Sequence, residues 1–255
     1  MEKYFSKTLG SLVYCGTPST PSTWDQHWEG DLKTEFKINH FVVNETKIYL
    51  PAGSKIIEGG CGAGDKVYSL KKAGYDVYGI DFAEKTVKFL KANTDLKIDL
   101  ADIRKLPFPD NTFDGYWSMG VIEHFIDGVD APIAEISRVV KPGGYLFLTV
   151  PAMSPLRKIK ASLSMYPEKE TQFENFYQYV YPPEFIQKKL EGVGFKLQKK
   201  KGLDGFKGIK DEFEISSLGV IYRSNSLPAR IIKKAVNMLF ARASGHVWYY
   251  VFKRD

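Results

Sequence analysis

The chain has 255 residues, of which 44% are hydrophobic and 26% charged, and a net charge of +6 at pH 7. These values are typical of a soluble globular protein, and we expect one domain with additions. Neither a membrane-spanning helix, which needs roughly 20 apolar residues, nor a secretion signal is predicted, because polar residues interrupt every apolar run. The two cysteines, Cys15 and Cys61, cannot form a disulfide framework, so we expect a reduced, cytoplasmic protein.

The positive charge is concentrated near the C-terminus. From Phe195 onward thirteen Lys or Arg stand against five Asp or Glu, a balance of +8, which leaves −2 for the preceding residues. Such a region can bind nucleic acid, anionic lipid or an acidic substrate. Solvated lysines on surface helices explain the pattern equally well, and we favour that interpretation.

The first fifty residues differ from the rest of the chain. They contain the turn-rich stretch GTPSTPST and a helix expected from about Asp31 through KTEFKINHFVV. We therefore predict an N-terminal helical cap segment over residues 1–50, followed by the main domain over residues 51–255.

From about Lys55 to Val150 short apolar runs alternate with longer helical patterns. Strands are predicted in KIIEGG, YDVYGID, LKIDLAD, FDGYWSMGVIEHF and GYLFLTVP, and helices in DKVYSLKKAG, AEKTVKFLKANT and DAPIAEISRVVKPGG. Strands that alternate with helices pair in parallel through right-handed crossovers. The pattern predicts an α/β fold with a doubly wound sheet.

Two segments depart from this alternation. Residues 152–181 contain prolines, methionines and the aromatic cluster FENFYQYVY, and we expect them to form a lid insertion. Residues 202–245 are predicted to be a helical insertion, since Pro228 and Gly245 bracket the stretch LPARIIKKAVNMLFARAS. A final strand is expected in HVWYYVFKR.

Glycines cluster directly behind the first strand of the alternating region. The stretch IIEGGCGAGD has glycines at 60, 62 and 64, which let a ligand approach backbone N–H groups and the N-terminus of the next helix. The spacing is G-x-G-x-G rather than the G-x-G-x-x-G of dinucleotide sites. Glu58 and Asp65 would repel a diphosphate, so a zwitterionic ligand with a cationic group is favoured.

Two further acids follow strands at the same edge of the sheet. Asp81 ends the second strand, 17 residues after Gly64, and is placed to accept hydrogen bonds from ribose hydroxyls. Asp102 follows the third strand and is expected near an adenine amino group. A helix cap at Asp81 and a turn at Asp102 are the structural alternatives.

These stretches, together with ADIRKLPFPDNTFDGYWSMGVIEHF and VVKPGGYLFLTVP, resemble the motifs of class I S-adenosylmethionine-dependent methyltransferases. Among these, they resemble the small-molecule group that includes the ubiquinone- and menaquinone-biosynthesis methyltransferases. The resemblance covers about Lys55 to Val150 and implies a Rossmann-like, seven-stranded sheet whose last strand is antiparallel. It implies S-adenosylmethionine as cofactor and S-adenosylhomocysteine as product.

The resemblance also assigns cofactor contacts. The methionine portion would be held by the backbone around the glycines, with Glu58 near its ammonium group, and the base would be flanked by Phe82. The full set of expected cofactor residues is Glu58, Gly60, Cys61, Gly62, Gly64, Asp81, Phe82, Asp102, Ile103, Ser118, Met119 and Gly120. Cys61 is expected to fill space rather than to act as a nucleophile.

His124, in VIEHFID, is the candidate catalytic residue. It follows the fourth strand, where the transferred methyl group should lie, and would accept a proton from a substrate hydroxyl. A purely structural role, holding the loop, stays open. Some relatives bind a divalent metal through an acid three positions before the Glu-His pair, but Gly120 stands there. We therefore predict no metal site at Glu123 and His124.

The aromatic residues outside the motifs have open roles. Tyr177, Tyr179 and Tyr181 would shape an acceptor pocket, or else form a satellite core or a dimer face. Trp24 and Trp28 would close the cofactor site or only pack. The helix over LPARIIKKAVNMLFARAS would rest on a membrane surface or pack onto the domain or a second subunit, and packing is favoured.

The sequence thus predicts methyl transfer to a small organic acceptor, with O-methylation favoured. N-methylation, an RNA or protein methyltransferase that uses the basic C-terminal region, and a non-enzymatic cofactor-binding regulator are the alternatives. Nucleic acid is not a favoured partner, and a monomer or homodimer is expected. The acceptor has no motif in this sequence.

Overall fold

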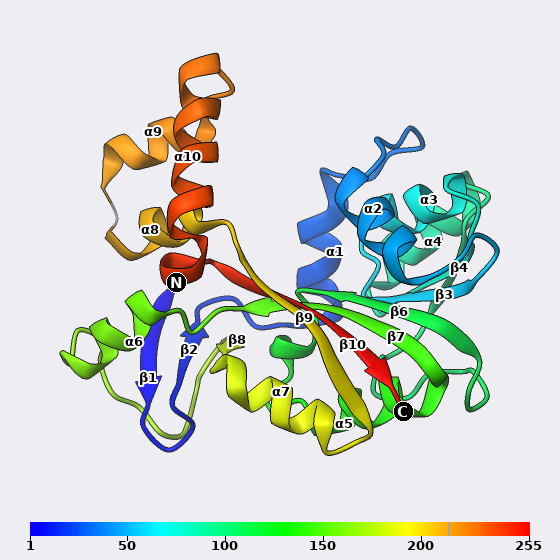
Figure 1. Ribbon diagram of the computed structural model, residues 1–255, viewed down its shortest axis with the longest axis horizontal. Coiled ribbons are helices and arrows are strands. Elements are labelled where there is room, and N and C mark those ends of the chain that lie inside the picture. Colours follow the sequence, from blue (N-terminus) through cyan, green and yellow to red (C-terminus); the bar gives the residue numbers. More distant parts are fainter. Residues whose placement is uncertain (214) are drawn as a thin grey trace.

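The computed structural model describes residues 1–213 and 215–255. A seven-stranded sheet with the order β5-β4-β3-β6-β7-β10-β9 forms its centre (Figure 1). The strands are β3 (Lys55–Gly59), β4 (Asp76–Asp81), β5 (Lys97–Leu100), β6 (Phe113–Met119), β7 (Val140–Pro151), β9 (Phe195–Leu203) and β10 (Val247–Arg254). All run in one direction except β10, which is antiparallel to both of its neighbours. The predicted doubly wound sheet with an antiparallel last strand is confirmed.

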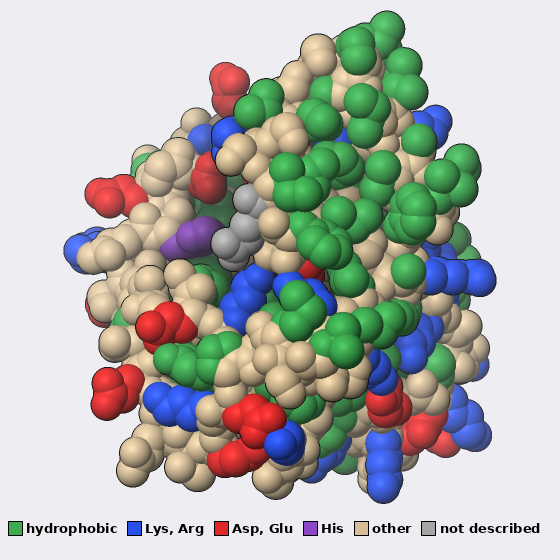
Figure 2. Space-filling model, turned by 90° about the vertical axis from the view of Figure 1, so that its left-hand side faces the viewer, with side chains coloured by type: hydrophobic (Ala, Val, Ile, Leu, Met, Phe, Trp, Pro, Cys, Tyr) green, Lys and Arg blue, Asp and Glu red, His purple; other side chains and the backbone are tan. Residues whose placement is uncertain are grey.

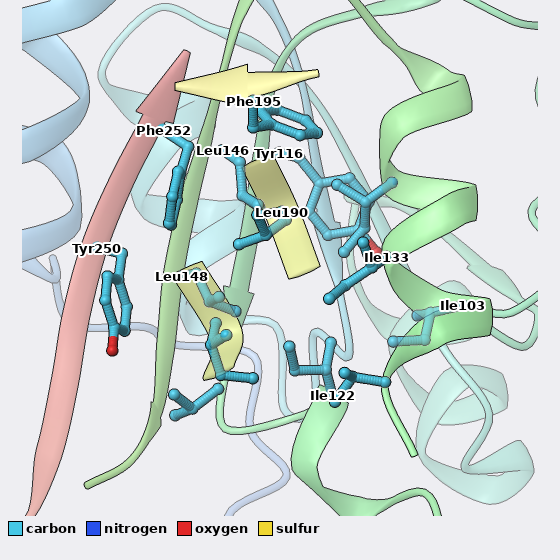
Figure 3. Close-up of a cluster of buried hydrophobic side chains, with 14 of the residues drawn as sticks. Ile103, Tyr116, Ile122, Ile133, Leu146, Leu148, Leu190, Phe195, Tyr250 and Phe252 are labelled. Atoms are coloured by element: carbon cyan, nitrogen blue, oxygen red, sulfur yellow. The ribbon is translucent and has the colours of Figure 1, made fainter. Parts of the chain in front are cut away.

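Helices cover both faces of this sheet. One face packs against α2 (His40–Tyr49), α3 (Asp65–Lys72) and α4 (Glu84–Asn93), and the other against α5 (Asp130–Val139) and α7 (Pro183–Glu191). Successive side chains of a strand point to opposite faces, so in β6 Tyr116 enters the α5–α7 core and Trp117 the α2–α4 core. Figure 3 shows part of the α5–α7 core, where Leu190 and Phe195 lie beside Leu146.

The N-terminal segment differs from the sequence prediction. It begins with a hairpin of β1 (Glu2–Ser6) and β2 (Ser11–Cys15), which pairs with β8 (Phe176–Val180) in a separate antiparallel sheet. The helix expected from Asp31 through HFVV begins only at His40, as α2, and a further helix, α1 (Pro21–Glu29), precedes it. Asn39 caps α2 by accepting from the Val42 amide at 3.2 Å, which sets the start of that helix at His40.

The two predicted insertions lie at the same edge of the sheet. The first includes α6 (Pro155–Ser162) and ends in β8, so it forms one unit with the N-terminal hairpin. The second is made of α8 (Gly205–Phe213), α9 (Ser216–Arg223) and α10 (Leu227–Ser244), and it projects from the sheet between β9 and β10 (Figure 1). Within the described ranges no helix is both long and apolar enough to cross a membrane. The division of the chain at residue 50 stays a prediction.

Candidate functional site

A cavity of about 440 Å³ lies at the carboxyl ends of the central strands. Its walls come from the loops that follow β3 to β6, from α1 and from the residues before β8. Eight of the sequence-predicted site residues line it, namely Gly60, Asp81, Phe82, Asp102, Ile103, Met119, Gly120 and His124. Ligands of open α/β sheets bind at this edge, and the cavity therefore defines the candidate site.

The glycine loop approaches its neighbours so closely that side chains are excluded. Gly60 has φ +75°, and a Cβ built there would lie 2.5 Å from Val121. Gly62 has φ +50°, and a Cβ there would lie 2.5 Å from the Trp28 ring. Both positions combine the left-handed backbone region with a close approach, which only glycine tolerates. Cys61, Gly62 and Gly64 shape this loop from behind the cavity wall rather than lining it.

The buried Asp81 carboxylate fixes the glycine loop to the end of β4. Its Oδ2 accepts from the Gly62 amide at 2.7 Å, and its Oδ1 accepts from the Ala83 amide at 2.9 Å. Burial raises the pKa of Asp81, against the opposing effect of these N–H groups. The side chain lines the cavity and keeps free acceptor capacity on each oxygen, since a carboxylate has about four lone-pair sites.

Asp102 lines the cavity but already has a partner. The Arg104 guanidinium donates from Nη2 to its Oδ2 at 2.6 Å, and the Arg104 amide donates to its Oδ1 at 2.8 Å. The pKa of Asp102 is lowered, because these hydrogen bonds outweigh partial burial. A base amino group would have to share this carboxylate with Arg104, which sequence reasoning did not anticipate.

Glu58 lies behind the cavity wall and not in it. It is fully buried, and burial raises its pKa to about 7 in spite of Lys66, whose ammonium is 2.9 Å from Oε1. Its Oε2 has no hydrogen-bond partner among the described residues. Lys66 lines the cavity and Glu58 does not, so a ligand would meet the Lys66 side chain before Glu58. The expectation that Glu58 itself contacts a ligand ammonium is therefore not supported by this placement.

At the end of β6, adjacent residues differ in whether they line the cavity. Met119 and Gly120 line the cavity, whereas Ser118 is fully buried and does not. The alternation of side chains along a strand turns Ser118 away from the face that Met119 takes. The Ser118 hydroxyl has no hydrogen-bond partner among residues 1–213 and 215–255.

His124 lies on the cavity wall in the short helix η1 (Ile122–His124). Its Nδ1 is 2.7 Å from the Tyr177 carbonyl oxygen. A carbonyl can only accept, so Nδ1 carries the proton and Nε2 is left as the acceptor in the neutral ring. Burial lowers the pKa of His124 to about 4, so the ring is neutral at pH 7.

Glu123, the residue before His124, does not line the cavity. It is 2% exposed, its Oε2 has no partner within the described part of the chain, and burial raises its pKa to about 8. The carboxyl is therefore largely protonated at pH 7. No group of three or more His, Cys, Asp or Glu side chains suited to a metal ion occurs among the residues that the structure describes.

The aromatic residues divide into two groups. Trp24 and Trp28 of α1 line the cavity, and the Trp24 ring packs edge-on against His124 with 4.9 Å between centroids. Tyr177 also packs against His124, at 4.8 Å, and stacks against Trp24 with 6.3 Å between centroids. Tyr179 and Tyr181 are buried in the α5–α7 core and do not line the cavity, which favours the packing alternative for these two residues.

Several lining residues escaped the sequence prediction. Phe125, Phe173 and Phe176 add apolar side chains to the wall, Asn175 adds a polar one, and Lys66 and Arg104 supply cations. Phe125 and Lys66 are adjacent to predicted motifs, and that adjacency was the available signal. Phe173 and Phe176 reach the site only through the pairing of β8 with β2, for which the local sequence has no signal.

Comparison with known proteins gives a consistent result. Residues 57–148 match the family described as "Methyltransferase domain". A probable S-adenosylmethionine-dependent methyltransferase of Mycolicibacterium smegmatis is 26% identical over 64% of this chain and 60% of its own length. The 27-O-demethylrifamycin SV methyltransferase of Amycolatopsis mediterranei is 34% identical over 42% of this chain and 43% of its own. The demethylmenaquinone methyltransferase of Staphylococcus saprophyticus is 35% identical over 37% of this chain and 43% of its own length.

Solved structures share the fold over nearly the whole chain. The [4+2]-cyclase SpnF covers 95% of this chain and 98% of its own, with a TM-score of 0.57 and 17% identity. The match to a SAM-dependent methyltransferase of Archaeoglobus fulgidus covers 84% of this chain and 93% of that one, with a TM-score of 0.53 and 19% identity. The chain spans 60% or less of the length of the three relatives above. The fold is thus shown, and the activity must be argued from the site.

Proposed function

We propose that this chain, whose residues 57–148 match a methyltransferase domain, transfers a methyl group from S-adenosylmethionine to an oxygen of a small organic acceptor. The neutral His124 carries the proposal, because its Nδ1 is held by the Tyr177 carbonyl at 2.7 Å while Nε2 stays available as a proton acceptor. When bound, the cofactor supplies an electrophilic methyl group on a positively charged sulfur.

The residues at the cavity suit a nucleoside linked to an amino acid. Asp81 offers oxygens to ribose hydroxyls, and Phe82 and Ile103 offer apolar surfaces to a base. Gly60 brings the backbone of the glycine loop to the cavity wall, where a ligand can approach it without a side chain in between. Lys66 suits the carboxylate of the amino-acid portion, with the buried Glu58 behind it.

The wall around His124 suits a mostly apolar acceptor. Trp24, Phe125 and Phe176 surround the imidazole side of the cavity, and such a wall excludes water from the reacting groups. Methyl transfer needs alignment more than covalent catalysis, so residues that hold the acceptor in position contribute most of the acceleration. His124 then removes the proton that a hydroxyl loses as it is methylated.

An oxygen acceptor is favoured over an amine for two reasons. An amine can react as its free base without a residue to take its proton first, whereas a hydroxyl gains from a neutral imidazole close by. One relative is named for methylation at a 27-O position of a rifamycin. Both observations support O-methylation, and the identity of the acceptor is left to experiment.

The cofactor is tested first by calorimetry. We expect the protein to bind S-adenosylmethionine and S-adenosylhomocysteine and to ignore NAD. A protein that binds NAD instead would contradict the cofactor assignment. Transfer of labelled methyl groups to a panel of hydroxyl- and amine-bearing metabolites then identifies the acceptor.

The base is tested on the acceptor so found. His124→Ala should lower kcat by about 10²-fold or more, the order of general-base catalysis, and leave cofactor affinity within a few-fold. His40→Ala, at an exposed histidine of α2 outside the cavity, is the matched control and should keep full turnover. Unchanged turnover in His124→Ala, or an amine acceptor, would favour N-methylation instead.

A further inference from the structure

The helical insertion leaves a broad apolar face without a partner. In α10 the side chains of Leu227, Ile231 and Met238 are 68%, 59% and 77% exposed. Their spacings of four and seven residues put them on one side of the helix, and Ile232 and Leu239 widen that side. Figure 2 shows hydrophobic side chains gathered on the upper part of the molecule, the part that α9 and α10 occupy in Figure 1.

The charge of this region has one sign. From residue 215 to residue 254 the sequence contains seven Lys or Arg and no Asp or Glu. Four of these cations, Arg230, Lys233, Lys234 and Arg242, belong to α10 itself. The exposed apolar face is therefore accompanied by positive charge that no acid of the same segment offsets.

A groove between β9 and α10 combines the same two properties. Its volume is about 1160 Å³, and Met238, Leu239 and Trp248 are among its apolar lining residues. Five cations and one acid line it as well, namely Lys199, Lys200, Lys201, Lys234, Arg242 and Asp204. The groove is thus cationic and apolar, and it is continuous with the exposed face through Met238. Anionic headgroups suit such a groove, with hydrocarbon beside them.

We propose that α9, α10 and the β9–α10 groove dock this protein onto the surface of an anionic phospholipid bilayer. Amphipathic helices with basic flanks bind such surfaces by placing their apolar side chains at the headgroup boundary. A second copy of the chain is disfavoured as occupant, since a two-fold interface would bring like charges together. Nucleic acid would use the cations and leave the apolar side chains in water.

The topology relates this surface to the candidate site. The insertion follows the carboxyl end of β9, which points the same way as β3 to β7. The docking surface and the cavity thus belong to the same edge of the sheet. The docking proposal does not depend on methyl transfer, since it uses none of the cavity residues.

Cosedimentation with vesicles tests the proposal. The full chain should sediment with vesicles of phosphatidylcholine and phosphatidylglycerol in equal parts, and about tenfold less with phosphatidylcholine alone. Raising the salt concentration should weaken the binding. Lys234→Ser and Arg242→Ser should each lower the partition coefficient about fivefold, the effect of one basic residue near an anionic surface.

Variants at apolar positions complete the test. Met238→Glu combined with Leu239→Glu should lower the partition about tenfold or more, whereas Ile48→Glu, at an apolar side chain 64% exposed on α2, should have no effect. Cofactor affinity and circular dichroism establish that each variant is folded. Equal binding by the double variant, or no binding to either vesicle, overturns the proposal, as does a dimer in sedimentation velocity that the double variant dissociates.

Discussion

Trp28 lies against Gly62, so close that a Cβ on this glycine would be 2.5 Å from the indole ring. The two residues belong to different units, since Trp28 is on α1 and Gly62 is in the loop after β3. The N-terminal segment thereby covers the glycine loop, and Trp28 lines the cavity beside it. Closure of the site from the N-terminal side, which the sequence left open, is supported by this contact.

This contact makes Gly62 sensitive to the smallest side chain. Gly62→Ala should weaken cofactor binding about tenfold or more, because the methyl group displaces Trp28 and φ is +50°. Adding Trp28→Ala should restore the space but not the backbone preference, so recovery should be partial. Calorimetry with S-adenosylhomocysteine measures both effects. Gly30→Ala, where a Cβ meets nothing within 4 Å, is the control, and equal affinity in all variants would contradict the assigned role of the loop.

Asp81 is expected to matter for binding and for stability together. In Asp81→Asn one of the two N–H groups that donate to Asp81, from Gly62 and Ala83, faces an NH₂ group instead of an oxygen. Leaving such a group unpaired reduces stability by about 1–3 kcal/mol. Urea denaturation and calorimetry should both register the change. Asp99→Asn breaks only an exposed ion pair with Lys91 on the edge strand β5, so it should leave binding unchanged and alter stability by less than about 1 kcal/mol. A binding defect in Asp81→Asn without a stability loss would refute the loop-fixing role.

The pH profile of turnover tests the state of His124. Its pKa is lowered to about 4 by burial, and a base acts only when deprotonated. The rate should therefore be independent of the His124 charge from about pH 5 upward and should fall as the pH drops through 4. The measurement is kcat/KM against pH with the identified acceptor. A fall centred near pH 6.5 that is absent in His124→Ala would show that the imidazole titrates as if exposed.

The buried Glu123 carboxyl should make the stability of the protein depend on pH. Burial raises its pKa in the folded state to about 8, above the roughly 4.3 of an unfolded chain. The neutral Glu123 therefore contributes its full stabilisation below the pKa of the unfolded chain. This contribution is lost as the pH rises through the folded-state pKa of about 8. The side chain in Glu123→Gln is neutral at every pH. Between pH 5 and 9 the free energy of unfolding of this variant should therefore rise relative to that of the wild type, by as much as about 4 kcal/mol. If the free energies of unfolding of the two proteins changed with pH in the same way, the Glu123 carboxyl would not be buried without a partner.

A buried ion pair holds the insertions together. Arg157 of α6 donates from Nε to Oε1 of Glu212 in α8 at 2.8 Å, and both side chains are 1% exposed. Glu212→Ala would leave Arg157 without its carboxylate and should reduce stability by about 3–5 kcal/mol. Glu184→Ala breaks only the exposed pair with Lys158 and should change stability by less than about 1 kcal/mol. Urea denaturation compares the two, and similar losses would argue against a structural role for the buried pair.

The sequence predicted the central sheet because its signals are local. Apolar runs of strand length, helical periodicities and the glycine cluster each depend on a few neighbouring residues, and chirality fixes how they connect. The glycine loop, Asp81 and Asp102 could be assigned to one edge of the sheet for the same reason. The helix over residues 227–244 was also predicted from its own caps and composition.

Contacts between distant segments were decided only by the tertiary structure. The hairpin β1–β2 pairs with β8, and His124 is held by Tyr177, 53 residues further along the chain. Trp28 covers Gly62, and Lys66 rather than Glu58 meets the cavity. Such contacts depend on how large units pack, which no short stretch of sequence encodes, because each side chain has many apolar partners of similar energy. Local patterns therefore determined the scaffold and the cofactor edge, and long-range packing determined the walls of the site.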